Sequence, residues 1–123
     1  MASETYPGAA FVGDSNFLDL NLGATAVNDI DGGGCTLYLV DVDNSANSAA
    51  SFIKFWDAAA PDVGTDAPME QYKIAASKRE VWIIPRGLTF GTGLSLAMLT
   101  VGGTGGAVSP ASAVIVRLNY NTT

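Results

Sequence analysis

The sequence predicts an all-β fold, an antiparallel, jelly-roll-like β-sandwich with an extended N-terminal arm. Roughly seven or eight short apolar runs recur at a spacing of roughly ten residues, as in sandwiches and barrels. Turn-forming residues, chiefly glycine, proline, aspartate and asparagine, separate these runs. A length of 123 residues fits one domain. We therefore expect a flexible arm over residues 1–15 and a single sandwich domain over residues 16–123.

The first expected strand covers residues 17–22, FLDLNL, in which apolar and polar residues alternate. Alternation places Leu18, Leu20 and Leu22 on one face, which we expect to be the buried one. Residues 24–30 are compatible with another short strand before the glycine turn at residues 31–34. The next run, CTLYLVDV, is rich in β-branched and aromatic residues and predicts a central strand over residues 35–42.

The run SFIKFWD, residues 51–57, fits two structures. Its apolar residues have helical spacing, but a short strand with Ile53 and Phe55 inward and Lys54 outward fits as well. We favour the strand. Later strands are expected at residues 70–74, 80–84, 94–101 and 113–120. The tripeptide at residues 85–87, Pro-Arg-Gly, is expected to break the strand before it.

The composition argues against several classes of function. Only 15% of the residues are charged and 48% are hydrophobic, so we expect part of the surface to meet other protein. The net charge is −6 and the six Lys and Arg residues are scattered, which disfavours nucleic acid and anionic membranes as partners. We expect neither a signal peptide nor a membrane span. Histidine is absent, and the single cysteine, Cys35, is expected to be a buried small hydrophobe.

The stretch GLTFGTG, residues 87–93, raises the question of a phosphate-binding loop. A P-loop needs Lys and Ser or Thr after its last glycine, and Leu94 stands there instead. A dinucleotide-binding turn needs a third glycine and a following helix, and neither is expected here. We interpret Gly87, Gly91 and Gly93 as positions of positive φ or close backbone approach at a corner of the sandwich.

Acidic pairs at Asp29 with Asp31 and at Asp41 with Asp43 suggest calcium. An EF-hand loop starting at Asp41 fails, because its sixth and twelfth positions hold alanine and phenylalanine. A looser site of oxygen ligands remains an alternative, but carboxylates that bond the backbone of turns are the simpler interpretation. A glycosidase pair of carboxylates also remains open, although we interpret Glu70 as a surface residue, like Glu80.

Four aromatic residues offer a further alternative, a platform on which a sugar ring stacks: Trp56, Tyr72, Trp82 and Tyr120. Aromatic residues in strands more often belong to a core or to a subunit contact, so we favour that interpretation.

Four stretches of the chain resemble small structural proteins of tailed bacteriophages of the capsid decoration, or cement, type. They are FIKFWD, PDVGTDAP, GLTFGTGL and VIVRLNY, at residues 52–57, 61–68, 87–94 and 114–120. The resemblance covers about two thirds of the chain and supports the strand at residues 52–56. It implies a jelly-roll-like β-sandwich in a virion.

From these observations we expect a protein that is not an enzyme and uses no cofactor or metal. The leading hypothesis is a capsid decoration protein on the outer surface of a phage head, assembled in the host cytoplasm. Its expected partners are the major capsid protein and itself, as a homotrimer, with no nucleic acid and no membrane. The candidate contact residues are Tyr6, Phe11, Asp62, Val63 and Asp66. Alternatives are a phage tail, neck or fibre protein, and a carbohydrate-binding module.

Overall fold

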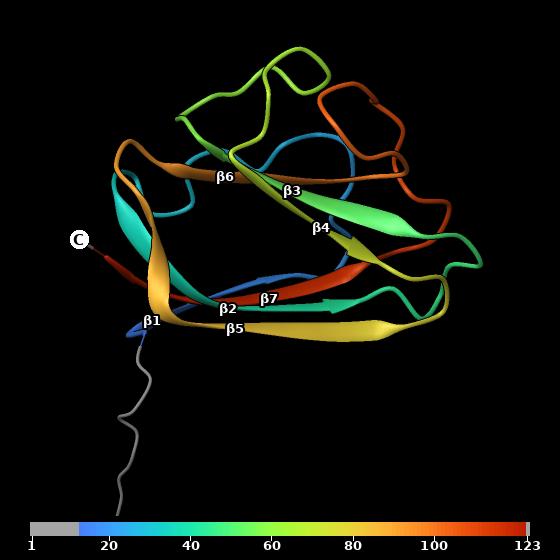
Figure 1. Ribbon diagram of the computed structural model, residues 1–123, viewed down its shortest axis with the longest axis horizontal. Coiled ribbons are helices and arrows are strands. Elements are labelled where there is room, and N and C mark those ends of the chain that lie inside the picture. Colours follow the sequence, from blue (N-terminus) through green and yellow to red (C-terminus); the bar gives the residue numbers. More distant parts are fainter. Residues whose placement is uncertain (1–12, 123) are drawn as a thin grey trace, which may run out of the picture.

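The structure, a computed structural model, describes residues 13–122 as two antiparallel β-sheets that face each other, consistent with a β-sandwich (Figure 1). The larger sheet has the strand order β1-β7-β2-β5, and the smaller one has the order β4-β3-β6. The strands are β1 (Ser15–Asp19), β2 (Cys35–Asp43), β3 (Ser51–Asp57), β4 (Glu70–Ile74), β5 (Arg79–Phe90), β6 (Leu94–Leu99) and β7 (Ile115–Thr122). The all-β prediction is therefore confirmed.

The main hydrophobic core lies between the two sheets and takes side chains from both. Alternate residues of a strand point to opposite faces, so β2 contributes Val40 and Val42, and β3 contributes Ile53 and Phe55. Leu37 of β2 is buried as well, because the strand shifts register between Leu37 and Leu39. All five side chains are fully buried. The central position predicted for residues 35–42 is confirmed, since β2 lies between β7 and β5.

The inward face predicted for residues 17–22 is wrong in the strand itself. Phe17 packs against the core, whereas Leu18 and Leu20 are 55% and 61% exposed. Strand β1 ends at Asp19, and the Asp19 carboxylate accepts a hydrogen bond from the N–H of Asn21. This turn interrupts the alternation, so Leu22 enters the core although Leu20 does not.

Residues 24–30 form no regular strand. Val27 makes an isolated bridge with Leu96 of β6, and its N–H donates to the Leu96 carbonyl at 2.9 Å. The N–H of Ile30 likewise donates to the carbonyl of Leu94. The segment therefore lies along the outer edge of β6 and occupies backbone groups that an edge strand would otherwise expose.

The break predicted at residues 85–87 is also wrong, because β5 continues through it to Phe90. The pairing of β2 with β5 shifts register between Leu37 and Leu39, and this irregularity accommodates the extra β5 residues. Gly87 has φ 77°, and a Cβ there would clash with Thr36 Cγ2. Proline is tolerated at this place because β5 is an edge strand.

Candidate binding surfaces and internal sites

The glycine-rich turn between β5 and β6 binds an anionic group, and this group is a carboxylate of the same chain. The Asp57 carboxylate at the end of β3 accepts hydrogen bonds from the N–H groups of Gly91, Thr92 and Gly93 at 3.2, 2.8 and 3.1 Å. These hydrogen bonds, the one from Thr92 above all, lower the pKa of Asp57. A Cβ at Gly93 would lie 2.6 Å from Asp29 Oδ1, so this glycine also permits a close approach. The turn is occupied and offers no free phosphate cradle.

The predicted contact residues Asp62, Val63 and Asp66 lie in the loop between β3 and β4. The Asp66 carboxylate accepts from the Asp62 N–H, and the Asp62 carbonyl accepts from the Asp66 N–H at 2.8 Å. The Asp66 carbonyl accepts from Trp56 Nε1 at 2.9 Å. Val63 packs against the cluster around Trp56, so it anchors the loop, while both aspartates remain exposed. The other two predicted contact residues, Tyr6 and Phe11, lie outside the described residues.

The outer side of the smaller sheet is covered by two loops, residues 58–69 and residues 101–106, which we call the roof (Figure 1). Beneath the roof, a second apolar cluster forms around Trp56, Ala97 and Leu99. The two loops touch each other, because a Cβ at Gly64 would lie 3.3 Å from the Gly106 carbonyl oxygen. Trp56 is therefore only 3% exposed, although it points away from the main core.

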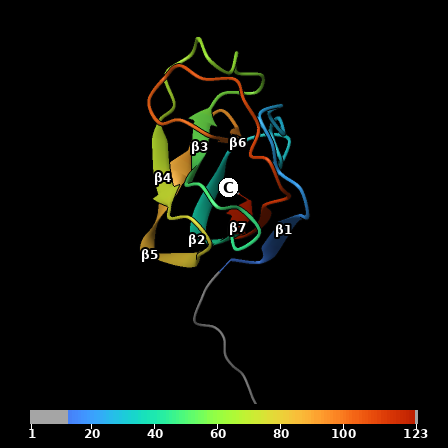
Figure 2. The same cartoon turned by 90° about the vertical axis from the view of Figure 1, so that its right-hand side faces the viewer.

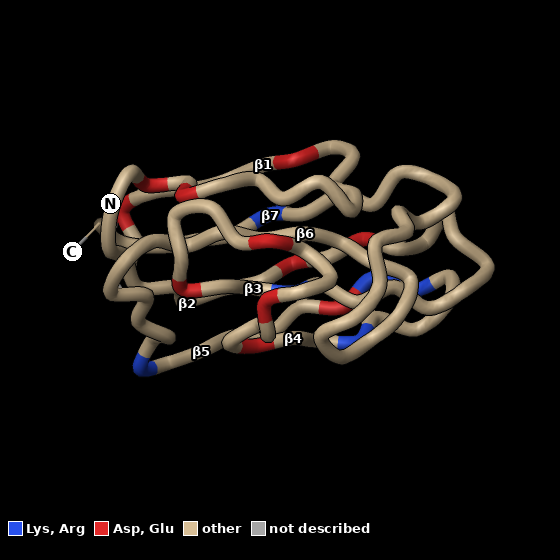
Figure 3. The backbone as a smooth tube through the Cα atoms, turned by 90° about the horizontal axis from the view of Figure 1, so that it is seen from above, with Lys and Arg blue, Asp and Glu red and all other residues tan. Residues whose placement is uncertain are grey.

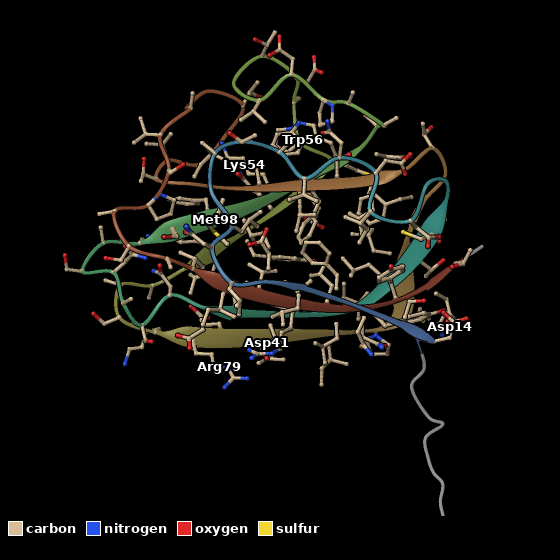
Figure 4. All side chains as sticks on the ribbon, turned by 180° about the vertical axis from the view of Figure 1, so that it is seen from behind. Asp14, Asp41, Lys54, Trp56, Arg79 and Met98 are labelled. Atoms are coloured by element: carbon tan, nitrogen blue, oxygen red, sulfur yellow. The ribbon has the colours of Figure 1, made fainter. Side chains whose placement is uncertain are left out.

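Lys54 lies beneath this roof and is fully buried, which the sequence-based prediction missed (Figure 4). It does point away from the main core, as predicted, but into the roof rather than into water. Its Nζ donates to the carbonyl oxygens of Gly103 and Gly105 at 2.6 and 3.0 Å. Burial lowers the pKa of Lys54. The neighbouring Gln71 accepts from the Gly103 N–H, so β3 and β4 together hold the glycine-rich loop.

The acidic pairs bond the protein itself. Both Asp41 oxygens accept from Arg79, at 2.9 and 2.7 Å, in a bidentate ion pair. Asp43 accepts from the Ser45 N–H, and Asp29 accepts from the Gly33 N–H. Within residues 13–122 no group of three or more acidic or cysteine side chains is placed to hold a metal ion. The Lys and Arg residues are dispersed over several strands (Figure 3).

Cys35 is fully buried at the start of β2. Burial, with smaller contributions from Asp31, Asp29 and Asp57, raises the pKa of its thiol to about 11. The thiol is therefore neutral at ordinary pH, as expected for a small buried hydrophobe rather than a nucleophile.

The four aromatic residues proposed as a sugar platform are not brought together. Tyr72 of β4 and Trp82 of β5 stack on each other with centroids 4.7 Å apart, on the side where these two strands lie (Figure 2). Tyr120 is buried in the main core, and Trp56 lies under the roof. The stacked pair closes one side of the sandwich and packs against its core.

A cavity of about 380 Å³ opens between residues 21–25 and residues 109–113. The hydroxyl of Ser109 lies in one part of the cavity and accepts a hydrogen bond from the Ala24 N–H at 2.8 Å. Its lining contains no aromatic residue and one carboxylate, from Asp19. These groups define no recognisable ligand chemistry.

The outer side of the larger sheet differs from that of the smaller one, because no described segment covers it (Figure 1). Apolar side chains are exposed there at Leu18, Val81 and Ile83, which are 55%, 50% and 69% exposed. We call this surface the open face.

Comparison of the chain with family models, curated proteins and solved structures finds no match. No helix that could cross a membrane occurs in residues 13–122, which contain strands and connecting segments only.

Proposed function

We propose that this chain is a non-enzymatic structural protein of a tailed-phage virion, a capsid decoration protein that binds the outside of the head and bridges coat subunits. The jelly-roll topology and the N-terminal arm belong to the same proposal. The observation that carries it is the open face: a chain with only 15% charged residues leaves apolar side chains of a regular sheet exposed. Apolar surface of this kind is typical of proteins that assemble with other proteins.

The positions of the four phage-like stretches also support the proposal. They fall on β3, on the loop after it, on the end of β5 with the turn that leads into β6, and on β7. Trp56 and Asp57, adjacent in β3, hold the loop and the turn respectively. Hydrogen bonds therefore join three of the four stretches, which supports a shared fold as the basis of the resemblance.

Such a protein works through binding free energy. Each copy stabilises the shell by binding the assembled coat rather than its free subunits, and symmetry repeats this contribution over many copies. The exposed carboxylates of Asp62 and Asp66 lie at the surface of the roof and remain candidate contacts with the coat.

A tail, neck or fibre protein with the same fold is the second candidate, since an assembling surface serves there equally well. A sugar-binding role for Trp56 is not favoured, because the roof covers that side chain.

The decisive experiment measures how many copies of the protein bind to each phage particle. Purified protein is mixed with undecorated phage heads, and bound copies per particle are measured by quantitative mass spectrometry. Hundreds of copies per head are expected for a decoration protein. A count of about a dozen or fewer moves the protein to the tail, and no binding to either part refutes the virion proposal.

A further inference from the structure

The described chain begins on the outer side of the larger sheet. Leu118 and Tyr120 of β7 are buried in the main core, so Asn119 between them points to the open face. The Asn119 side chain accepts a hydrogen bond from the Gly13 N–H at 2.9 Å and donates one to the Gly13 carbonyl at 3.1 Å. A side chain of the open face therefore holds both backbone groups of Gly13.

The chain turns away from the line of β1 at this place. Ser15 is the first residue of β1 and pairs with Tyr120, and just before it the chain bends at Asp14. Figure 4 shows Asp14 at one end of the larger sheet, away from Arg79. Gly13 lies so close to β7 that a Cβ there would approach the Tyr120 nitrogen to 2.7 Å, which glycine permits. The segment that precedes Gly13 is thus joined to the domain on the open face.

Apolar side chains of the open face lie next to Gly13. Leu39 of β2 pairs directly with Asn119, and Ile83 of β5 pairs directly with Leu39. Residues directly opposite in an antiparallel pair share a face, so these three residues form a row across the open face. Neighbouring strands are about 4.8 Å apart, and Ile83 at the end of the row is 69% exposed. We call Leu39 and Ile83 the apolar row.

The sequence of residues 1–12 suits such a surface. It contains Tyr6, Phe11 and Val12, and Glu4 is its one charged side chain. Large apolar side chains lower the free energy when they leave water for an apolar surface, and a single carboxylate at one end of a segment does not oppose this.

The tether is long enough for the segment to cover the face. Phe11 precedes Gly13 by two residues, a span of about 7 Å, and the apolar row begins one strand spacing, about 4.8 Å, from Asn119. Phe11 can therefore reach Leu39 and Ile83 directly. Tyr6 precedes Phe11 by five residues, a span of about 17 Å, so the remaining segment is long enough to cross β5.

We propose that residues 1–12 pack across the open face of their own chain, with Phe11 on Leu39 and Ile83. Attachment at Gly13 favours the chain's own segment over that of a second copy, because a short tether gives an effective concentration on the order of millimolar. The segment then covers the larger sheet as the roof covers the smaller one.

The proposal concerns the free protein and goes beyond the role in a virion. In a decoration protein, the coat would displace the segment from the open face. The face, Tyr6 and Phe11 would then become available to the coat in one step.

The rate at which a maleimide labels the Ile83→Cys variant tests the proposal. The native Cys35 is fully buried and its pKa is raised to about 11, so it contributes little to the labelling. If the segment leaves the face for about a tenth of the time, labelling is about tenfold slower than in the same variant without residues 1–12. The protection should be equal at about 1 and about 100 µM protein, because the contact is intramolecular.

Matched variants locate the contact. Phe11→Ser, added to Ile83→Cys in the full chain, should speed labelling several-fold, whereas Ala2→Ser in the same segment should leave it unchanged. Val108→Cys is the control for the probe: Val108 is 64% exposed in the loop before β7, and its labelling should not depend on residues 1–12. Thermal unfolding of each variant monitors the fold.

Three outcomes would overturn the proposal. One is equal labelling of Ile83→Cys with and without residues 1–12. Another is protection that appears only at the higher protein concentration, which would make a second copy the source of the segment. The third is protection that Phe11→Ser leaves intact. None of these measurements involves phage heads, so this proposal and the virion proposal can fail separately.

Discussion

Substitution of Lys54 is the strongest test of what holds the roof in place. Lys54 is fully buried and joins β3 to the roof loop at residues 101–106 through two hydrogen bonds. Lys54→Met keeps most of the aliphatic stem but removes both donors. Lys54→Ala removes the stem as well and leaves a cavity. Lys73→Met is the matched control, since Lys73 is an exposed lysine on the adjacent strand β4.

The expected magnitudes follow from these contacts. Hydrogen bonds from a charged donor contribute about 1.5–3 kcal/mol each, and the cost of burying the ammonium opposes them. We expect Lys54→Met to lower the free energy of unfolding by about 2 kcal/mol, and Lys54→Ala by about 4 kcal/mol because buried methylene groups are also lost. At about 4 °C per kcal/mol, melting temperatures fall by about 8 and about 16 °C. Lys73→Met should change stability by less than about 0.5 kcal/mol.

Urea unfolding followed by tryptophan emission measures these differences, and hydrogen exchange at the Gly103 N–H measures local release of the loop. A Lys54→Met variant as stable as the unmodified protein, with unchanged exchange at Gly103, would refute the reasoning. It would mean that the cost of burying the ammonium equals all that its hydrogen bonds contribute.

The pH dependence provides an independent check. The pKa of Lys54 is lowered from 10.5 in the fold, so between its folded value and 10.5 the unfolded chain binds more protons. Stability relative to Lys54→Met should therefore rise with pH across this window and level off above 10.5. A neutral amine still carries two N–H donors for its two carbonyl partners. The titrations of Cys35 and the tyrosines occur in both proteins and cancel in the difference.

Three further predictions concern the turn between β5 and β6, Gly87 opposite the register shift of β2, and the N-terminal segment. Asp57→Ala should lower the free energy of unfolding by about 2 kcal/mol at neutral pH, and because the pKa of Asp57 is lowered from 3.8, the difference should shrink in urea titrations as pH falls below 3.8. Gly87→Ala should cost about 3 kcal/mol in calorimetry, since φ is 77° and Thr36 blocks the new Cβ. Removal of residues 1–12 should weaken binding to undecorated heads in a pelleting assay, and undiminished binding contradicts a role for Tyr6 and Phe11. The melting temperature of the shortened chain is the control for folding, since Gly13 and Asp14 keep their bonds to β7.

The strands could be predicted because their signals are local. Residues 35–42 and 51–57 are β-branched and aromatic runs between turn residues, and both became strands at or within a residue of the expected bounds. The phase of β1 could not be predicted, because alternation defines two faces without saying which is inside. Residues 17–22 contain three leucines and one phenylalanine, so the leucines suggest the buried face. The chain bends at Asn21, however, and within β1 it is Phe17 that packs against the core.

The internal sites depend on partners that are distant in sequence. Asp57 fills a turn that lies more than thirty residues away, and Lys54 is buried by a loop about fifty residues away. Neither residue type suggests burial when taken alone. The tripeptide at residues 85–87 has the composition of a strand end, and only the irregularity opposite it in β2 shows why β5 continues.

The internal role of the phage-like stretches affects where binding surfaces should be sought. Asp57 and Trp56 use the turn and the loop to close the fold, so a resemblance in those residues reports the scaffold. Partner contacts then depend on what the scaffold leaves exposed, which is the open face on one side and the carboxylates of the roof on the other.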